Sequence, residues 1–542
     1  MKRVVLCIVI LGSCVFIAVA ERKPFSVIEA TIPEMQRALK DKRVTSRELV
    51  QQYLIRIATY DDKLHAIITV NPNALKEAEE LDRERAQGKV RGPLHGIPIA
   101  LKDIIQTTNM PTTGGAMAFD GFIPPYQATL TKNLREAGAL IIAKTSLTEL
   151  ANWVSSDMPA NYNSISRFGM NPYDPRRDPR ETADGRALIN PGGSSSGIGT
   201  AANFWAANVG TETSGSLLTP ANATMLVAIK PTVGRISRYG VIPITADQDT
   251  PGPMAKNVTD AALLFGVLES KSADPNDPAT NRCSRPPDGD YRRFLRRDGL
   301  KGARIGIPRI AVSDNISPNG KKALADAINI LQQQGAVVVD PADIPTAAEF
   351  RLWNICRGAN NGKGKDAGCS SVLKYGMKRD FNAWLATLGA ASPVKTLTEL
   401  REWNQKHENS GSIKYGQSNL DISDEIDLEQ DRPKYEADRA RDLTLTATRG
   451  IDEVMKANHL DALVFPGNSG AALAARPGYP SILIPFAMLP NEVNSPLPEG
   501  FTSNPVPFGI TFTGMACSEP RLIELGYAFE QATNRRIPPK LP

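Results

Sequence analysis

Two short segments rich in glycine and serine contain the residues of this 542-residue chain that are best suited to nucleophilic chemistry. Residues 192–197 are GGSSSG and residues 210–216 are GTETSGS, so that Ser194 and Ser216 lie 22 positions apart. Small residues let the backbone turn sharply and bring its N–H groups close to a ligand. A flexible linker has a similar composition, but the apolar run at residues 198–209 favours a loop fixed between core elements.

A serine hydroxyl needs a base to become a nucleophile, and the candidate base in this chain is a lysine. Lys102 follows the apolar run at residues 97–101, where a strand would take its side chain into the interior. Burial would keep the amine neutral and able to accept a proton. The chain has four histidines, none in a metal-ligand spacing, so we expect neither a metal nor a cofactor. They are His65, His95, His407 and His459.

Eight short apolar runs bounded by glycine or proline predict strands that are buried on both faces. They are residues 97–101, 139–143, 226–229, 303–307, 336–339, 462–465, 482–484 and 508–512. A helical pattern capped by Ser317 and ending at Gln334 lies between the fourth and fifth runs, which predicts a βαβ unit. The fold class is therefore α/β, and no Gly/Ser linker divides the chain.

Several helix starts are also visible. Thr31 with Glu34, and Thr45 with Glu48, have the spacing of capping boxes. A last helix is expected from Ser518, with proline in its first turn. These helices have a structural role in our interpretation.

The ordered motifs resemble those of the amidase signature enzymes. Residues 96–98 leading to Lys102 and Asp103, the GGSS run at 192–195, Gly215-Ser216 and the KPT sequence at 230–232 are the main similarities. Residues 139–149, 240–255, 479–481 and 527–530 are also similar to that family. The resemblance covers the chain after its first twenty residues and is weakest between residues 270 and 450.

This resemblance implies a single domain, residues 21–542, built on a mixed β-sheet of about eleven strands flanked by α-helices. It makes Lys102 the base, Ser194 the bridging serine after a cis peptide bond, and Ser216 the nucleophile of an acyl-enzyme. The oxyanion hole would consist of backbone N–H groups of Thr213, Ser214, Gly215 and Ser216. The implied activity is a serine amidohydrolase that cleaves linear carboxamides. The patterns are most similar to the peptide amidase branch, so C-terminal peptide amides and small acyl amides are the expected substrates.

Three departures from the family pattern affect this assignment. The two serines are two positions closer together than in most relatives, which implies a shorter helix after Gly197 and leaves Ser195 or Ser196 open as the bridge. Ser214 replaces a glycine, which a positive φ would penalise. Leu218 stands where many relatives have arginine, which argues against a glutamine-handling transamidase.

Two other functions stay open on the sequence. Residues 193–197 also satisfy the G-x-S-x-G motif of α/β-hydrolase esterases, with Ser195 as nucleophile and His407 or His459 as base. That motif requires a preceding strand, and the sequence NPG at 190–192 is a poor strand end. A catalytically inactive amidase-like binding protein is the second alternative, although Lys102, Ser194 and Ser216 are all present.

The first twenty residues predict a secretory signal peptide. Lys2 and Arg3 precede an apolar run at residues 4–20 that ends in a small-x-small cleavage pattern at Ala20. An uncleaved anchor is the alternative, since such a run is at the lower limit for a membrane span. We expect a secreted protein without stable membrane insertion after cleavage.

Charge and cysteine content restrict the partners and the compartment. The net charge is +5, from 63 basic and 58 acidic residues with no dense basic track, so nucleic acid is not an expected partner. The expected partner is a small-molecule or peptide amide. Four cysteines follow the signal segment, and two disulfides are possible, with Cys356 and Cys369 the easiest pair by loop length. These four are Cys283, Cys356, Cys369 and Cys517.

Overall fold

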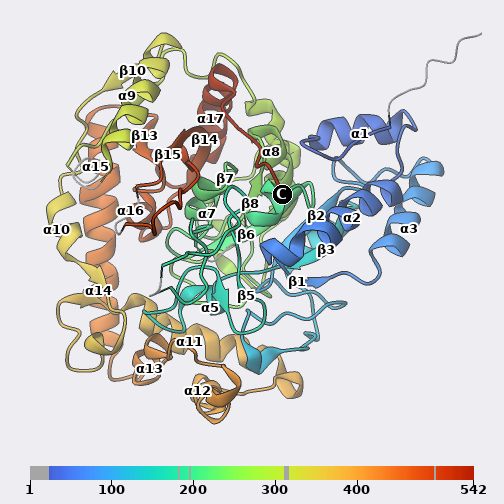
Figure 1. The fold of residues 1–542 in the computed structure, drawn as a ribbon. Coiled ribbons are helices and arrows are strands. Elements are labelled where there is room, and N and C mark those ends of the chain that lie inside the picture. Colours follow the sequence, from blue (N-terminus) through green and yellow to red (C-terminus); the bar gives the residue numbers. More distant parts are fainter. Residues whose placement is uncertain (1–23, 181–182, 194–196, 311–315, 493–495, 542) are drawn as a thin grey trace, which may run out of the picture.

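A mixed eleven-stranded β-sheet is the centre of the computed structural model, which describes residues 24–180, 183–193, 197–310, 316–492 and 496–541 (Figure 1). The strand order is β1-β3-β2-β6-β8-β7-β14-β15-β13-β9-β10. The strands are β1 (Ile67–Val70), β2 (Pro98–Lys102), β3 (Leu140–Thr145), β6 (Ala207–Glu212), β7 (Val227–Lys230), β8 (Thr250–Ala255), β9 (Arg304–Gly306), β10 (Val337–Val339), β13 (Ala462–Pro466), β14 (Ser481–Leu489) and β15 (Val506–Thr513). Short pairs β4 (Tyr162–Asn163) with β5 (Arg167–Phe168), and β11 (Asn354–Ile355) with β12 (Cys369–Ser370), lie outside it.

All eight apolar runs form strands of this sheet, at bounds close to those predicted. The βαβ unit is also confirmed, because β9 and β10 are parallel and are joined by α9 (Pro318–Gln333), whose N-cap is Ser317. Both capping boxes are present, at α1 (Ile32–Lys40) and α2 (Ser46–Leu64). Strands β1, β6 and β8 were not predicted, and two of them position the site described below.

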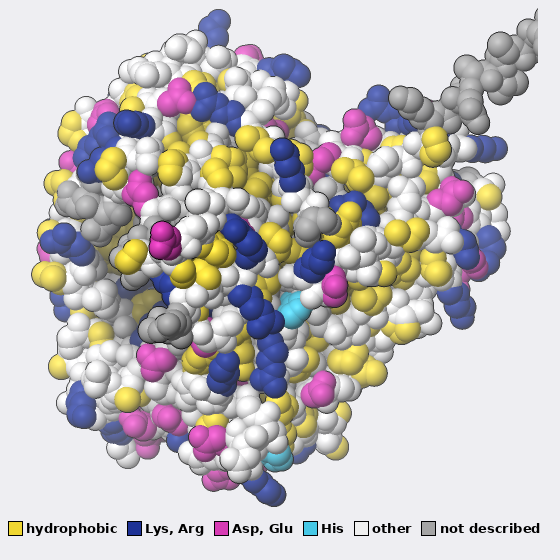
Figure 2. Space-filling model, in the orientation of Figure 1, with side chains coloured by type: hydrophobic (Ala, Val, Ile, Leu, Met, Phe, Trp, Pro, Cys, Tyr) yellow, Lys and Arg dark blue, Asp and Glu magenta, His cyan; other side chains and the backbone are white. Residues whose placement is uncertain are grey.

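Helices flank the sheet, and α1, α2 and α9 have been named above. The others are α3 (Ala74–Ala86), α4 (Thr129–Glu136), α5 (Glu149–Asn152), α6 (Ile198–Ala201), α7 (Leu218–Ala223), α8 (Val258–Leu268), α10 (Ala347–Leu352), α11 (Val372–Thr387), α12 (Leu397–Lys406), α13 (Ser418–Asp424), α14 (Arg432–Leu443), α15 (Asp452–Ala457), α16 (Ala471–Ala475) and α17 (Glu519–Thr533). In Figure 1, α11, α12 and α13 lie together at the lower edge, and α14 rises from them at the left. On the face drawn in Figure 2, basic and acidic side chains are interspersed.

Two disulfides join the four cysteines. Cys356 pairs with Cys369, as loop length predicted, and Cys283 pairs with Cys517 across a separation of 234 residues. Within the described ranges, no helix is both long and apolar enough to span a bilayer. The proposed signal segment lies outside those ranges, as do Ser194, Ser195 and Ser196.

Candidate active site

Lys102 is the last residue of β2 and its side chain is fully buried. Its Nζ donates a hydrogen bond of 2.8 Å to Oγ1 of Thr211 in the neighbouring strand β6. Burial lowers the pKa of Lys102 to about 7, although the charges of Asp249 and Glu212 act to raise it. A large fraction of this amine is therefore unprotonated near neutral pH, as a general base requires.

Strand β6 leads directly into the turn that contains Ser216. β2 and β6 are parallel, with Leu101 opposite Val209, so Lys102 and this turn lie at the same edge of the sheet. Glu212, the last residue of β6, accepts hydrogen bonds from the backbone N–H groups of Leu217 at 2.8 Å and Leu218 at 3.0 Å. This buried carboxylate therefore binds the chain immediately after Ser216 and caps the N-terminus of α7.

The turn at residues 213–216 presents unpaired backbone donors. Within the described part of the chain, the N–H groups of Ser214, Gly215 and Ser216 have no protein acceptor. Backbone N–H groups that are free in a turn can bind an anionic oxygen, as an oxyanion hole does. Gly215 adopts φ +92°, whereas Ser214 does not have a positive φ, so the penalty expected for serine at position 214 is not incurred. Ser216 itself is half-buried.

Gly192 and Gly193, which begin the GGSSSG segment, lie close to the same turn. A side-chain carbon added to Gly193 would lie 3.5 Å from Cα of Ser216, so the residue immediately before Ser194 is packed against the turn. Asn161 donates its amide N–H groups to the carbonyl oxygens of Gly192 and, at 2.8 Å, of Gly193. Gly192 has φ +89°, and an added side-chain carbon would lie 2.3 Å from Cα of Pro220, so only glycine fits there. The helix that follows, α6, has four residues.

Asp103 does not pair with its neighbour Lys102. Its carboxylate forms a fully buried ion pair of 2.8 Å with Lys144 of β3 and accepts the backbone N–H of Thr113 at 3.0 Å. Burial lowers the pKa of Lys144, and the charge of Asp103 opposes that effect. This pair holds the segment after β2 in place and leaves Lys102 directed at Thr211.

One requirement of the esterase alternative, a strand before the motif, is not met by the described residues. Residues 190–193 do not form a strand, which the G-x-S-x-G motif needs. His407 follows α12 and stacks on Trp403, with ring centroids 3.9 Å apart. His95 is buried with Nε2 3.0 Å from the carbonyl of Leu81, as expected for a packing residue. Among the described residues, no group of His, Cys, Asp or Glu could hold a metal ion.

Sequence reasoning missed four residues that shape this site. Thr211 binds the side chain of Lys102, and Glu212 binds the turn that contains Ser216. Asn161 binds the carbonyl oxygen of Gly193. Asp249 accepts a hydrogen bond from the hydroxyl of Thr213 at 2.5 Å. The only signal was the presence of Thr211, Glu212 and Asp249 inside motifs that were noted for their resemblance. Nothing in the sequence marks Asn161, because its contacts are made across 31 residues of chain.

Comparison with known proteins assigns this chain to one family. The chain matches the Amidase family over residues 48–523 and belongs to it. The matched range includes Lys102, Ser194 and Ser216. The chain is 36% identical to a probable amidase of Arabidopsis thaliana over 523 residues, covering 95% of this chain and 92% of that protein.

Solved structures agree with this assignment. The crystal structure of peptide amidase from Stenotrophomonas maltophilia superposes with a TM-score of 0.81 at 34% identity, covering 95% of this chain and 99% of that one. An amidase family protein from Bacillus anthracis gives 0.79 at 32% identity, covering 95% and 93%. The protein is therefore an amidase with the amidase signature fold, and the resemblance to peptide amidase seen in the motifs extends to the whole structure.

Proposed function

We propose that this amidase hydrolyses linear carboxamides through an acyl-enzyme on Ser216, with Lys102 as general base and Ser194 as the bridging serine. The observation that supports this most directly is the buried Lys102, bonded to Thr211 on the strand that runs into the Ser216 turn. The packing of Gly193 against Ser216 supports Ser194 as the bridge, because Ser194 follows it directly.

The proposed reaction proceeds in two halves. Neutral Lys102 accepts a proton from Ser194 as Ser194 accepts one from Ser216, whose Oγ bonds to the amide carbon. The oxyanion faces the N–H groups of residues 213–216, each of which can stabilise it by about 3 kcal/mol. The C–N bond then breaks as Ser194 gives its proton to the leaving amine or ammonia and takes one back from Lys102, which is neutral again. Water attacks the resulting ester, releases the carboxylic acid and restores Ser216.

The proposed substrates are C-terminal peptide amides and small acyl amides. Similarity in fold and sequence to a peptide amidase supports the first of these classes. A panel of N-acylated dipeptide amides, short aliphatic amides and the corresponding esters, with ammonia release measured for the amides, tests the choice. Faster turnover of aliphatic amides than of every peptide amide would exclude the peptide amidase assignment.

The activity is expected to rise with pH through neutrality. The neutral form of Lys102 is the active one and the pKa of this lysine is lowered to about 7, so kcat/KM should fall as pH drops below that value. The measurement is kcat/KM on the best amide from about pH 5 to about pH 10 at constant ionic strength. An acid limb near the ordinary lysine pKa, with little activity at neutral pH, would contradict a desolvated lysine base.

We also propose that residues 1–20 direct export and are removed near Ala20. The pairing of all four remaining cysteines in disulfides supports an oxidising compartment. Expression of the full chain in an exporting host should give a mature protein whose first residue lies close to Glu21, as measured by N-terminal sequencing. Retention of Lys2 and Arg3 in a membrane fraction would favour an uncleaved anchor instead.

A further inference from the structure

Asp249 lies beside both halves of the proposed machinery. Its Oδ1 accepts the hydroxyl of Thr213 at 2.5 Å, and its Oδ2 accepts the backbone N–H groups of Ile244 at 2.8 Å and Thr245 at 2.9 Å. The carboxylate also lines a small internal pocket together with Thr213 and with Thr211, the hydrogen-bond partner of Lys102. The sequence motif that contains Asp249 does not by itself assign this residue a role in the reaction.

Thr213 is held at two points by consecutive residues of this loop. Asp249 binds its hydroxyl, and the Gln248 side-chain amide donates to its carbonyl oxygen at 3.1 Å. Thr213 is the first residue after β6, so its position sets where the following N–H groups point. Fixed donors are worth more to an oxyanion than mobile ones, because they need no reorganisation during the reaction.

Helices α11 and α14 fix the loop that carries Asp249. Asp247 accepts the hydroxyl of Tyr435 from α14 at 2.9 Å and pairs with Arg379 of α11 at 3.1 Å. The backbone N–H of Ala246 donates to Asp380 of α11 at 2.6 Å. A side-chain carbon added to Gly376 would lie 2.2 Å from Oγ1 of Thr245, so α11 also packs directly on the loop.

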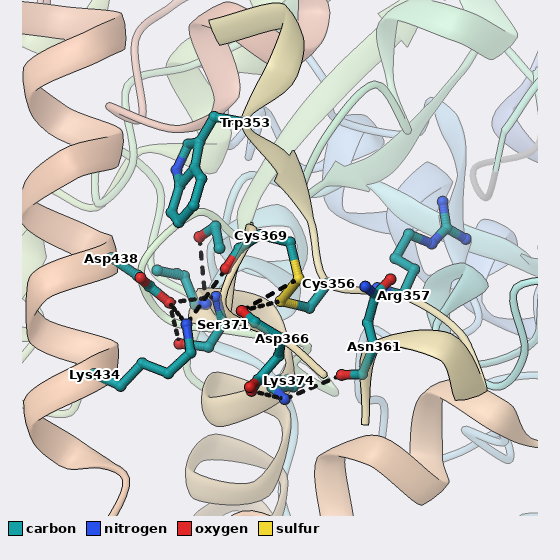
Figure 3. The surroundings of a disulfide bond; sticks show 12 residues. Trp353, Cys356, Arg357, Asn361, Asp366, Cys369, Ser371, Lys374, Lys434 and Asp438 are labelled. Atoms are coloured by element: carbon teal, nitrogen blue, oxygen red, sulfur yellow. Dashed lines mark hydrogen bonds and ion pairs between the residues drawn. A yellow bond between two sulfur atoms is a disulfide. The ribbon is translucent and has the colours of Figure 1, made fainter. Parts of the chain in front are cut away.

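Helices α11 and α14 are also joined to each other beside the Cys356–Cys369 disulfide. Ser371, which precedes α11, donates its backbone N–H and its hydroxyl to Asp438 of α14, at 2.9 Å and 2.6 Å. Lys434 of α14 pairs with the same carboxylate at 2.6 Å. Figure 3 shows Ser371, Lys434 and Asp438 next to the disulfide. Helices α11 and α14 are therefore joined to each other and both contact the loop at 244–249.

The charged groups around Asp249 are few. Asp380 of α11, Arg238 and Lys102 of β2 interact with it electrostatically, and Arg238 is itself paired with Asp277 at 2.5 Å. Burial raises the pKa of Asp249 to about 6, while its hydrogen bonds to Thr213, Ile244 and Thr245 lower it. The carboxylate is thus mostly ionised at neutral pH and places a negative charge near the base.

From these contacts we infer that Asp249 is a positioning residue for amide hydrolysis, which orients the donor turn through Thr213 and places a negative charge beside Thr211, the hydrogen-bond partner of Lys102. This inference rests on the proposed function of Lys102 and Ser216. It also assigns a role to part of residues 270–450, where the family resemblance is weakest. Helices α11 and α14 belong to that region and contact the loop that carries Asp249.

The test uses the full chain and a substrate-independent probe. The rate of phosphonylation of Ser216 by a fluorophosphonate is measured against pH for the wild type, Asp249→Asn, Thr213→Val and Asp260→Asn. In this reaction Ser216 Oγ bonds to phosphorus, fluoride leaves and the base takes the proton. Asp260 is the matched control, because it is also buried, accepts the backbone N–H of Ile32 at 3.0 Å and has a pKa raised by burial to about 7.

Each variant has a distinct expected result. Asp249→Asn should lower the maximal rate about tenfold to 100-fold and move the acid limb to lower pH by about half a unit to one unit, because the charge that raises the pKa of Lys102 is gone. Thr213→Val should lower the rate without moving the limb, and Asp260→Asn should change neither. An unmoved limb in Asp249→Asn, or the same shift in Asp260→Asn, would overturn the inference. Failure of the proposed function would look different, because the wild type would then not be labelled, or Lys102→Met, measured alongside, would be labelled as fast as the wild type.

Discussion

Replacing Ser216 with alanine is expected to lower kcat on amides by at least about 10⁴-fold, because the atom that bonds to the substrate is removed. Labelling by a fluorophosphonate should also disappear from the intact protein. The fold should be unaffected, since Ser216 is half-buried and Glu212 fixes the turn through Leu217 and Leu218. Thermal unfolding of the variant, compared with that of the wild type, checks this.

Ser214→Ala is the matched control for Ser216→Ala. Both serines belong to the same turn, and loss of the Ser214 hydroxyl leaves its backbone N–H in place, so activity should stay within a few-fold of wild type. Ser195→Ala, measured alongside, tests the esterase alternative. Full activity of Ser216→Ala would refute the proposed nucleophile, and absence of any labelled serine in the wild type would favour a binding protein.

Replacing Lys102 with methionine is expected to lower kcat by about 10²–10⁴-fold, and raising the pH should not restore it. The reason is that the amine that accepts the proton is removed: the Lys102 side chain is fully buried, and the neighbouring carboxylate of Asp103 is engaged by Lys144. Methionine keeps the length and fills the apolar space, so the loss measures the amine rather than a cavity. Rates of amide hydrolysis from neutral to alkaline pH provide the readout.

Lys256→Met is the control for burial of a lysine. Lys256 is also buried, desolvation lowers its pKa to about 8, and it donates to the carbonyl of Ala30 at 3.0 Å and to Asn203 at 2.9 Å, away from the proposed site. This variant should lose stability and retain turnover per folded molecule. Wild-type turnover of Lys102→Met at alkaline pH would contradict a lysine base, whatever the control shows.

The sequence predicted strands best where apolar runs were continuous. The eight predicted strands include β14 and β15, whose pairing over eight aligned positions makes them the centre of the second half of the sheet. Strand β8 was missed because Pro251 and Pro253 argue against a strand, and proline cannot donate to a ladder. It nevertheless lies between β6 and β7, where it aligns with β6 from Ala207 to Glu212. Pairing with both neighbours decided this, and no local pattern could show it.

For the site, the sequence by itself determined the reactive candidates and their order. The position of Lys102 after an apolar run, taken together with the serine-rich segments, predicted a candidate base, and the small residues before Ser216 predicted a tight turn. The surroundings of these residues were decided only by tertiary structure. Asp249 reaches Thr213 across 36 residues of chain and Lys102 reaches Thr211 across 109, because the sheet brings their strands to one edge. Burial, which lowers the pKa of Lys102, is likewise a property of the packed fold and has no counterpart in the residue itself.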